Sequence, residues 1–102
     1  MNMGEKIMIQ YVIQYTKAAD KFLKAHESLR TQYENALREL IAGDHPETVD
    51  VKRIQGKRST YYRIRLGNYR VVYTIIHNKI VVVCTLLAGS RGDVYKKMQG
   101  LK

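Results

Sequence analysis

Apolar residues dominate the stretch from Tyr61 to Leu87, which reads YYRIRLGNYRVVYTIIHNKIVVVCTLL, and they alternate with arginines from Tyr62 to Leu66. A period of two is typical of strands, because successive side chains point to opposite faces of a sheet. Two turn signals, Gly67-Asn68 and His77-Asn78, divide the stretch into three parts. Gly and Asn accept the positive φ angles that two-residue hairpins require. The pattern therefore predicts three antiparallel strands joined by two tight turns.

Two-residue turns also fix which residues of this meander face each other. The expected register pairs Leu66 with Tyr69, Arg65 with Arg70, Arg63 with Val72, Tyr73 with Val82 and Arg70 with Thr85. One face then carries an apolar core, made of Tyr62, Ile64, Leu66, Tyr69, Val71, Tyr73, Ile75, Ile80, Val82, Cys84 and Leu86. The other face carries Arg63, Arg65 and Arg70 beside Val72, Thr74, Val83 and Thr85.

The remaining elements follow from helical spacing and from β-branched runs. Lys6–Tyr15 predicts a first strand, because it is rich in Ile, Val and Tyr. Two helices are expected next, one capped by Thr16 and one by Ser28, with Gly43 ending the second. VKRIQG predicts a short edge strand with Ile54 pointing inward. The tail SRGDVYKKMQGLK predicts a short helix with Val94 and Met98 on one side.

This order of elements predicts an α+β fold for a single domain spanning residues 1–102. We expect an N-terminal strand and a helical hairpin packed on a mostly antiparallel sheet of about four strands. The helices are expected on one face of that sheet, and a short helix closes the chain.

The chain is strongly basic, with a formal net charge of +9 and a pI near 9.8. Such a charge favours nucleic acid, an acidic protein or an anionic membrane surface as a partner. No run approaches the ~20 apolar residues of a membrane span, so no membrane-spanning segment is expected, and we expect no membrane partner. The N-terminus, MNMGEKIMIQ, does not resemble a signal peptide. A single Cys84 among apolar neighbours indicates a structural thiol and a cytoplasmic protein.

Common catalytic motifs are absent from the sequence. The three histidines have no metal-ligand spacing, and there is no phosphate-binding glycine loop, nucleophile elbow or CxxC pair. We therefore expect neither a metal nor a cofactor.

A basic face with one nearby hydroxyl is the remaining candidate for chemistry. Arg63, Arg65 and Arg70 share a sheet face, and Arg91 stands four residues before Tyr95, on the same side of a helix. Arginines can hold a phosphate and stabilise charge that grows on it, and they favour a tyrosinate that acts as a base. RNA brings its own nucleophile, the 2′-hydroxyl. Spacing alone fits RNA cleavage and the binding of an acidic partner equally well.

The run YYRIRLGNYRVVYTIIHNKIVVVCTLLAGSRGDVYKK resembles the RelE/ParE superfamily of toxins from type II toxin–antitoxin modules. The shared pattern is a strand of alternating basic residues, a Gly-x-Tyr-Arg-Val-Val-Tyr strand, an apolar strand, and a loop leading to Arg and Asp-Val-Tyr. KAADKFLK and KRIQG fit upstream, so the resemblance covers nearly the whole chain. RelE-like members cleave mRNA in the ribosomal A site, whereas ParE-like members inhibit DNA gyrase.

The RelE-like pattern implies specific roles for residues of this chain. The positions that match its catalytic set are Arg63, Arg65, Arg70, Arg91 and Tyr95. Because a guanidinium scarcely deprotonates, proton transfer falls to Tyr95. The basic residues Lys52, Arg53, Lys57 and Arg58 are expected to bind ribosomal RNA through its phosphates.

The resemblance implies a ribosome-dependent mRNA interferase whose partners are the ribosome, mRNA and a cognate antitoxin. An acidic or amphipathic antitoxin segment would cover the arginine face. Two alternatives remain open at this stage. One is a gyrase inhibitor without nuclease activity, and the other is a non-catalytic RNA- or protein-binding relative.

Overall fold

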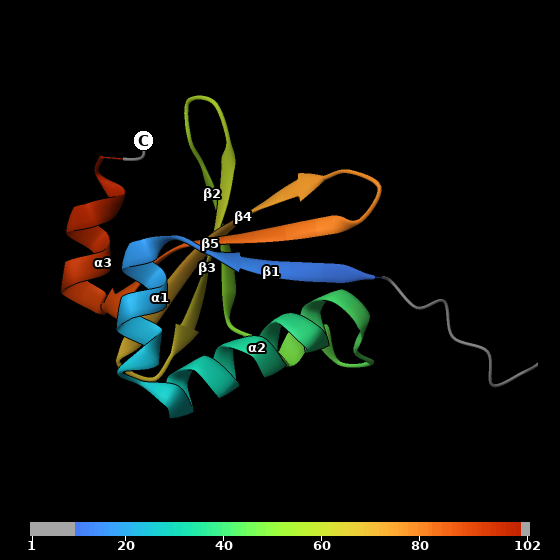
Figure 1. Cartoon of the computed structure of the whole chain (residues 1–102), viewed down its shortest axis with the longest axis horizontal. Coiled ribbons are helices and arrows are strands. Elements are labelled where there is room, and N and C mark those ends of the chain that lie inside the picture. The colour runs from blue at the N-terminus through green and yellow to red at the C-terminus, as the bar shows by residue number, and fades with distance from the viewer. Residues whose placement is uncertain (1–9, 101–102) are drawn as a thin grey trace, which may run out of the picture.

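The computed structural model describes residues 10–100, which form one five-stranded sheet and three α-helices (Figure 1). The strands lie in the order β1 (Tyr11–Tyr15), β5 (Val81–Ser90), β4 (Tyr69–His77), β3 (Thr60–Leu66) and β2 (Val51–Gln55). β1 runs parallel to β5, and every other neighbouring pair is antiparallel. The predicted α+β class is confirmed, with five strands instead of about four. Lys6 to Ile9 of the predicted first strand lie outside the described residues.

Two helices between β1 and β2 form the predicted hairpin. α1 (Lys17–Lys24) begins at Thr16, whose side chain accepts a hydrogen bond from the Ala19 N–H at 3.2 Å, as predicted. α2 (Glu27–Ala42) ends at Gly43, but it begins after His26 and not at Ser28. The helix begins there because the His26 carbonyl already accepts a hydrogen bond from the Arg30 N–H at 3.0 Å, and the His26 ring stacks on Phe22 with ring centroids 4.1 Å apart. A 3-10 helix, η1 (Pro46–Thr48), leads into β2.

The main core lies between this hairpin and one face of the sheet. Its buried residues come from both helices and from the three central strands: Leu23, Leu29, Tyr33, Leu37, Ile64, Val71, Tyr73, Val83 and Ala88. The Tyr33 hydroxyl is within 2.7 Å of Thr85 Oγ1, so two buried polar groups satisfy each other. This contact connects the middle of α2 to β5.

A smaller cluster lies on the opposite face of the sheet, beneath α3 (Arg91–Met98). Val94 and Met98 of that helix pack on Val72 of β4, and Ile54, Tyr61 and Leu87 border them. The predicted helix and its buried side are confirmed, and Ile54 of edge strand β2 points inward as predicted. The helical hairpin covers one face, but the final helix covers the other. It therefore shares the face that carries the arginines.

The predicted register is confirmed between β3 and β4 and is wrong between β4 and β5. Leu66 pairs with Tyr69 across Gly67, whose φ is +62°, the left-handed value expected for Gly in this hairpin. In contrast, His77 pairs with Val81 across a three-residue loop, and a bulge at Leu86 shifts the register once more. Tyr73 therefore pairs with Thr85 and not with Val82, and Arg70 pairs with Gly89 and not with Thr85.

The three-residue loop exchanges the two faces of β5 from Val81 to Thr85, and the bulge restores the expected faces at Leu87 and Ala88. Val83 and Thr85, predicted to lie beside the arginines, are fully buried on the main-core face. Val82 and Cys84, predicted to lie in that core, pair with Ile76 and Thr74 on the opposite face. No helix within residues 10–100 has the length and apolar character needed to cross a membrane.

Candidate active site

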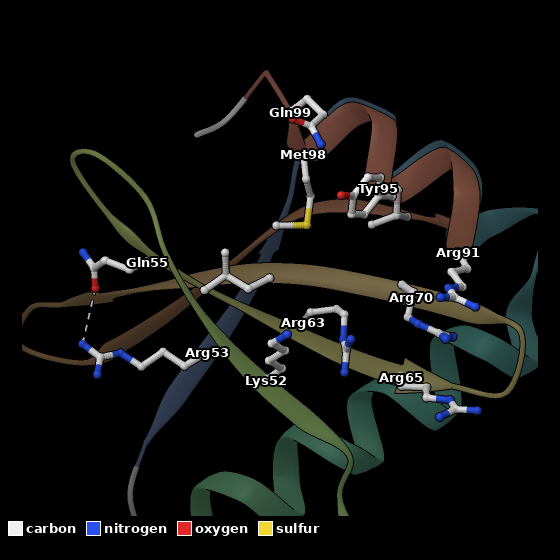
Figure 2. Close-up of a pocket in the computed structure, with 12 residues that line it drawn as sticks. Lys52, Arg53, Gln55, Arg63, Arg65, Arg70, Arg91, Tyr95, Met98 and Gln99 are labelled. Carbon is white, nitrogen blue, oxygen red and sulfur yellow. Dashed lines mark hydrogen bonds between the residues drawn. The ribbon is translucent and has the colours of Figure 1, made fainter.

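A pocket of about 630 Å³ lies between α3 and the sheet face formed by β2, β3 and β4 (Figure 2). All five residues of the predicted catalytic set line it: Arg63, Arg65, Arg70, Arg91 and Tyr95. Two residues of the predicted RNA-binding set, Lys52 and Arg53, also line it. Lys57 and Arg58 do not, since they lie at the turn between β2 and β3.

Cross-strand pairing arranges the basic residues of the sheet in two neighbouring rows. Arg65 lies directly opposite Arg70, and Arg63 lies between Lys52 on one side and Val72 on the other. Side chains of paired residues point to the same face, with their Cβ atoms about 5 Å apart. Figure 2 shows Arg65, Arg70 and Arg91 gathered at one end of the pocket. Arg53 points away from them and reaches Gln55 at 3.5 Å.

Arg70 is the most buried of these arginines, with 9% of its surface exposed. Its Nη1 donates to the carbonyl oxygens of Gly67 at 2.9 Å and Tyr69 at 3.0 Å. Burial lowers the pKa of Arg70, and the charges of Arg65, Arg63 and Arg91 lower it further. A guanidinium nevertheless remains a cation. Arg70 is therefore a fixed positive charge at the base of the pocket.

α3 brings Arg91 and Tyr95 to the opposite wall of the pocket. The Arg91 N–H donates to the Asn68 carbonyl at 3.2 Å, which joins the start of α3 to the β3–β4 turn. Ser90 caps the helix by accepting from the Asp93 N–H at 3.4 Å. Arg91 and Tyr95 are one helical turn apart and both line the pocket. The Tyr95 side chain is 66% exposed, so a ligand can reach it.

Arg63 lies on the floor of the pocket and is only partly satisfied. Its Nη2 is 3.4 Å from Asp50 Oδ1, and Arg65 Nη1 is 3.9 Å from Asp50 Oδ2. The Arg63 Nε is buried without a hydrogen-bond partner in the described part of the chain. Unpaired buried donors are costly, and they are uncommon away from functional sites.

Sequence reasoning missed several residues around this pocket. Asp50 was overlooked because it stands before the predicted edge strand, although extending the β2–β3 register by one step places it opposite Arg65. The amides of Gln55 and Gln99 line the end of the pocket away from Arg70, as does Met98, and Ile54 and Val94 are also among the lining residues. No sequence signal singled out the two amides.

The arrangement can bind a phosphate and stabilise added negative charge on it. Four arginines surround one space, and one of them is largely removed from water, where electrostatic interactions are stronger. The Tyr95 hydroxyl lines the same pocket and can exchange a proton with a ligand there. Within residues 10–100, no three His, Cys, Asp or Glu side chains gather as a metal site.

Comparison with known proteins defines the class of this chain. Residues 12–92 match the family described as ParE toxin of type II toxin-antitoxin system, parDE. The match covers well over half of the sequence, so the chain belongs to this family. It is accordingly a toxin of the RelE/ParE superfamily, which confirms the resemblance found in the sequence.

One solved structure supports the fold. It is the RelB-RelE antitoxin-toxin complex from Methanococcus jannaschii, at a TM-score of 0.51 and 21% sequence identity. The alignment covers 82% of this chain and 96% of the other. At this identity the likeness concerns the fold alone. No curated protein matches the sequence.

Proposed function

We propose that this toxin stops translation by cleaving mRNA on the ribosome. The observation that supports this function is the gathering of four arginines and Tyr95 around one pocket. The arginines come from β3, β4 and the start of α3, so their assembly depends on the whole fold. Inhibition of a protein target would not require a hydroxyl beside a partly desolvated phosphate site.

The proposed reaction uses the RNA as its own nucleophile. The 2′-oxygen attacks the adjacent phosphorus and gives up its proton to the phenolate form of Tyr95, while the bond from phosphorus to the 5′-oxygen breaks. The departing 5′-oxygen takes a proton from water, and the proton on Tyr95 neutralises the hydroxide that remains. The products are a 2′,3′-cyclic phosphate and a 5′-hydroxyl. Arg70, Arg63 and Arg65 stabilise the charge on the non-bridging oxygens, and Arg91 closes the site from α3.

The basic residues outside the catalytic set are proposed to bind RNA backbone. Lys52 and Arg53 extend the pocket along β2, and Lys57 and Arg58 carry positive charge to the end of the β2–β3 hairpin. Such contacts position a nucleic acid without reading its sequence. Ribosomal RNA is their proposed partner.

Toeprinting on translating ribosomes tests the proposal. Wild-type protein should produce cuts within the codon in the A site, and Arg70→Ala should abolish them and relieve toxicity. Cys84→Ser is the control, because Cys84 lies outside the pocket and is not in the catalytic set. Cuts that persist in Arg70→Ala, or their absence from the wild type, would reject ribosome-dependent cleavage.

Gyrase inhibition is the second candidate, and the match to ParE toxins is the observation that favours it. It predicts that purified toxin inhibits DNA supercoiling by gyrase and induces the DNA-damage response, with no cleavage of mRNA. A supercoiling assay with the toxin in excess separates the two functions, because an mRNA-cleaving toxin leaves gyrase active and a gyrase inhibitor does not.

A cognate antitoxin is the proposed protein partner, as the RelB-RelE complex illustrates for a protein of this fold. The pocket contains six basic side chains and no acidic one. An acidic antitoxin segment would therefore bind there and exclude RNA. Competition between a labelled RNA oligonucleotide and the product of an adjacent antitoxin gene tests this arrangement.

A further inference from the structure

Asp50 is an acidic residue that contacts two arginines of the pocket, Arg63 and Arg65. Its carbonyl oxygen accepts a hydrogen bond from the Arg65 N–H at 2.9 Å, which continues the β2–β3 ladder beyond the Val51–Ile64 pair. The backbone therefore fixes the place of Asp50 opposite Arg65. Its two carboxylate oxygens reach different arginines, Oδ1 toward Arg63 at 3.4 Å and Oδ2 toward Arg65 at 3.9 Å.

We propose that Asp50 is a positioning residue, which holds Arg63 and Arg65 side by side until a phosphate replaces it. This inference rests on the proposed RNA cleavage. Arg63 and Arg65 are two residues apart on one strand, and both line the same pocket as Arg70 and Arg91. Without an anion the four cations repel one another. A carboxylate that bridges two of them keeps both guanidinium groups directed toward the position of the phosphate.

The exposure of this contact favours replacement of the Asp50 carboxylate by a phosphate. Asp50 is 54% exposed, and solvent-exposed ion pairs contribute little to stability. The pairing also leaves the Arg63 Nε buried without a partner. A phosphate has more acceptor oxygens than a carboxylate, so it can satisfy Arg63 more fully. Asp50 thus orders the site in the free protein and gives way when RNA binds.

This role predicts opposite effects on binding and on cleavage. Asp50 competes with phosphate for the arginines, so removing its charge should strengthen RNA binding. Asp50 also positions the arginines, so the same change should slow the reaction of bound RNA. A catalytic group that is misplaced by about 1 Å can lower the rate by up to about 100-fold. If Asp50 served folding alone, its substitution would weaken binding and cleavage together.

The test compares Asp50→Asn with Glu47→Gln, which removes the same charge. Glu47 is 68% exposed and lies 3.8 Å from the His45 ring, whereas Asp50 contacts Arg63 and Arg65. Affinity is measured with a single-stranded RNA whose 2′-hydroxyls are methylated, over a range of salt concentrations. Cleavage is measured in single turnover on ribosome complexes at saturating toxin. Thermal unfolding of each variant verifies that it is folded.

Asp50→Asn should bind the RNA about threefold more tightly at low salt, with the salt slope steeper by up to about 0.7. Its cleavage at saturation should be about tenfold slower, whereas Glu47→Gln should match the wild type in both assays. Unchanged cleavage in Asp50→Asn, weaker binding, or an equal gain in affinity for Glu47→Gln would overturn the inference. A wild-type protein that cleaves no mRNA would reject the proposed function and the cleavage role of Asp50, while the binding assay would still decide whether Asp50 competes for the arginines.

Discussion

Arg65 and Arg70 lie directly opposite each other on the antiparallel strands β3 and β4. Like charges in this position repel, and here one of them is nearly buried. Burial lowers the pKa of Arg70, and the neighbouring charge of Arg65 lowers it further. A sheet selected for stability alone would not carry this pair. Binding of an anion, as the proposed function requires, would compensate for this repulsion.

The first prediction concerns the cost of this pair to stability. Arg65→Thr should raise the free energy of unfolding by about 0.5 kcal/mol, because it removes the repulsion and places a β-branched residue in a strand. Cleavage should fall at the same time. Urea unfolding at low salt measures the gain, and 1 M salt should shrink it by screening.

Arg53→Thr is the matched control, since Arg53 lies opposite Tyr62 and not opposite another cation. It should not produce the same gain. A less stable Arg65→Thr protein at low salt would show that Arg65 contributes more through its contacts than it costs through repulsion.

The second prediction assigns proton transfer to Tyr95. Tyr95→Phe removes one hydroxyl oxygen and should slow single-turnover cleavage about 100-fold, which is typical for a general acid or base. RNA affinity and stability should change little, because the side chain is 66% exposed and makes few packing contacts. Tyr11→Phe, on the distant edge strand β1, should retain full activity. Equal activity of both variants would place the proton transfer elsewhere.

The hairpin of β3 and β4 shows how far the sequence specifies the site. Gly67 and Asn68 predicted a two-residue turn, and that turn alone placed Arg65 opposite Arg70. The four-residue spacing of Arg91 and Tyr95 predicted their common side on a helix. These relationships are local along the chain, so spacing and turn chemistry determine them.

The register of β5 could not be predicted in the same way. VVVCTLL is apolar at nearly every position, so it contains no alternation that distinguishes one face from the other. The three-residue loop reversed the expected faces of residues 81–85, and the bulge at Leu86 restored them for Leu87 and Ala88. The burial of Thr85 depends on Tyr33, which is 52 residues away in the chain. Asp50 joined the site through a strand pairing whose exact start the sequence did not show.

The third prediction tests the buried contact between Tyr33 and Thr85. Tyr33→Phe should lower the free energy of unfolding by about 1–2 kcal/mol, because it leaves the Thr85 hydroxyl buried without its partner. Thr85→Val in the same protein should cost less than it does alone, since no hydroxyl then remains to be satisfied. Urea unfolding of the four proteins in this cycle measures the coupling. Additive losses would mean that the hydroxyls do not depend on each other.

The last prediction is a steep loss of stability in alkali. Burial raises the pKa of Tyr73 to about 12 and raises the pKa values of Tyr15 and Tyr33 as well. In the unfolded chain these groups ionise near their ordinary pKa of about 10. Between pH 10 and 12 the folded protein therefore holds more protons than the unfolded one, and its stability falls as pH rises.

Each of these tyrosines should contribute up to about 1.4 kcal/mol of lost stability per pH unit in that window. Below pH 9 the stabilising effect of their neutral forms should be complete. Urea unfolding at pH 9, 10 and 11 gives the slope, and tyrosinate absorbance reports ionisation as the protein unfolds. Tyr73→Phe should reduce the slope of unfolding free energy against pH by the contribution of one tyrosine, because phenylalanine does not titrate. A slope unchanged by Tyr73→Phe would show that Tyr73 ionises equally in both states.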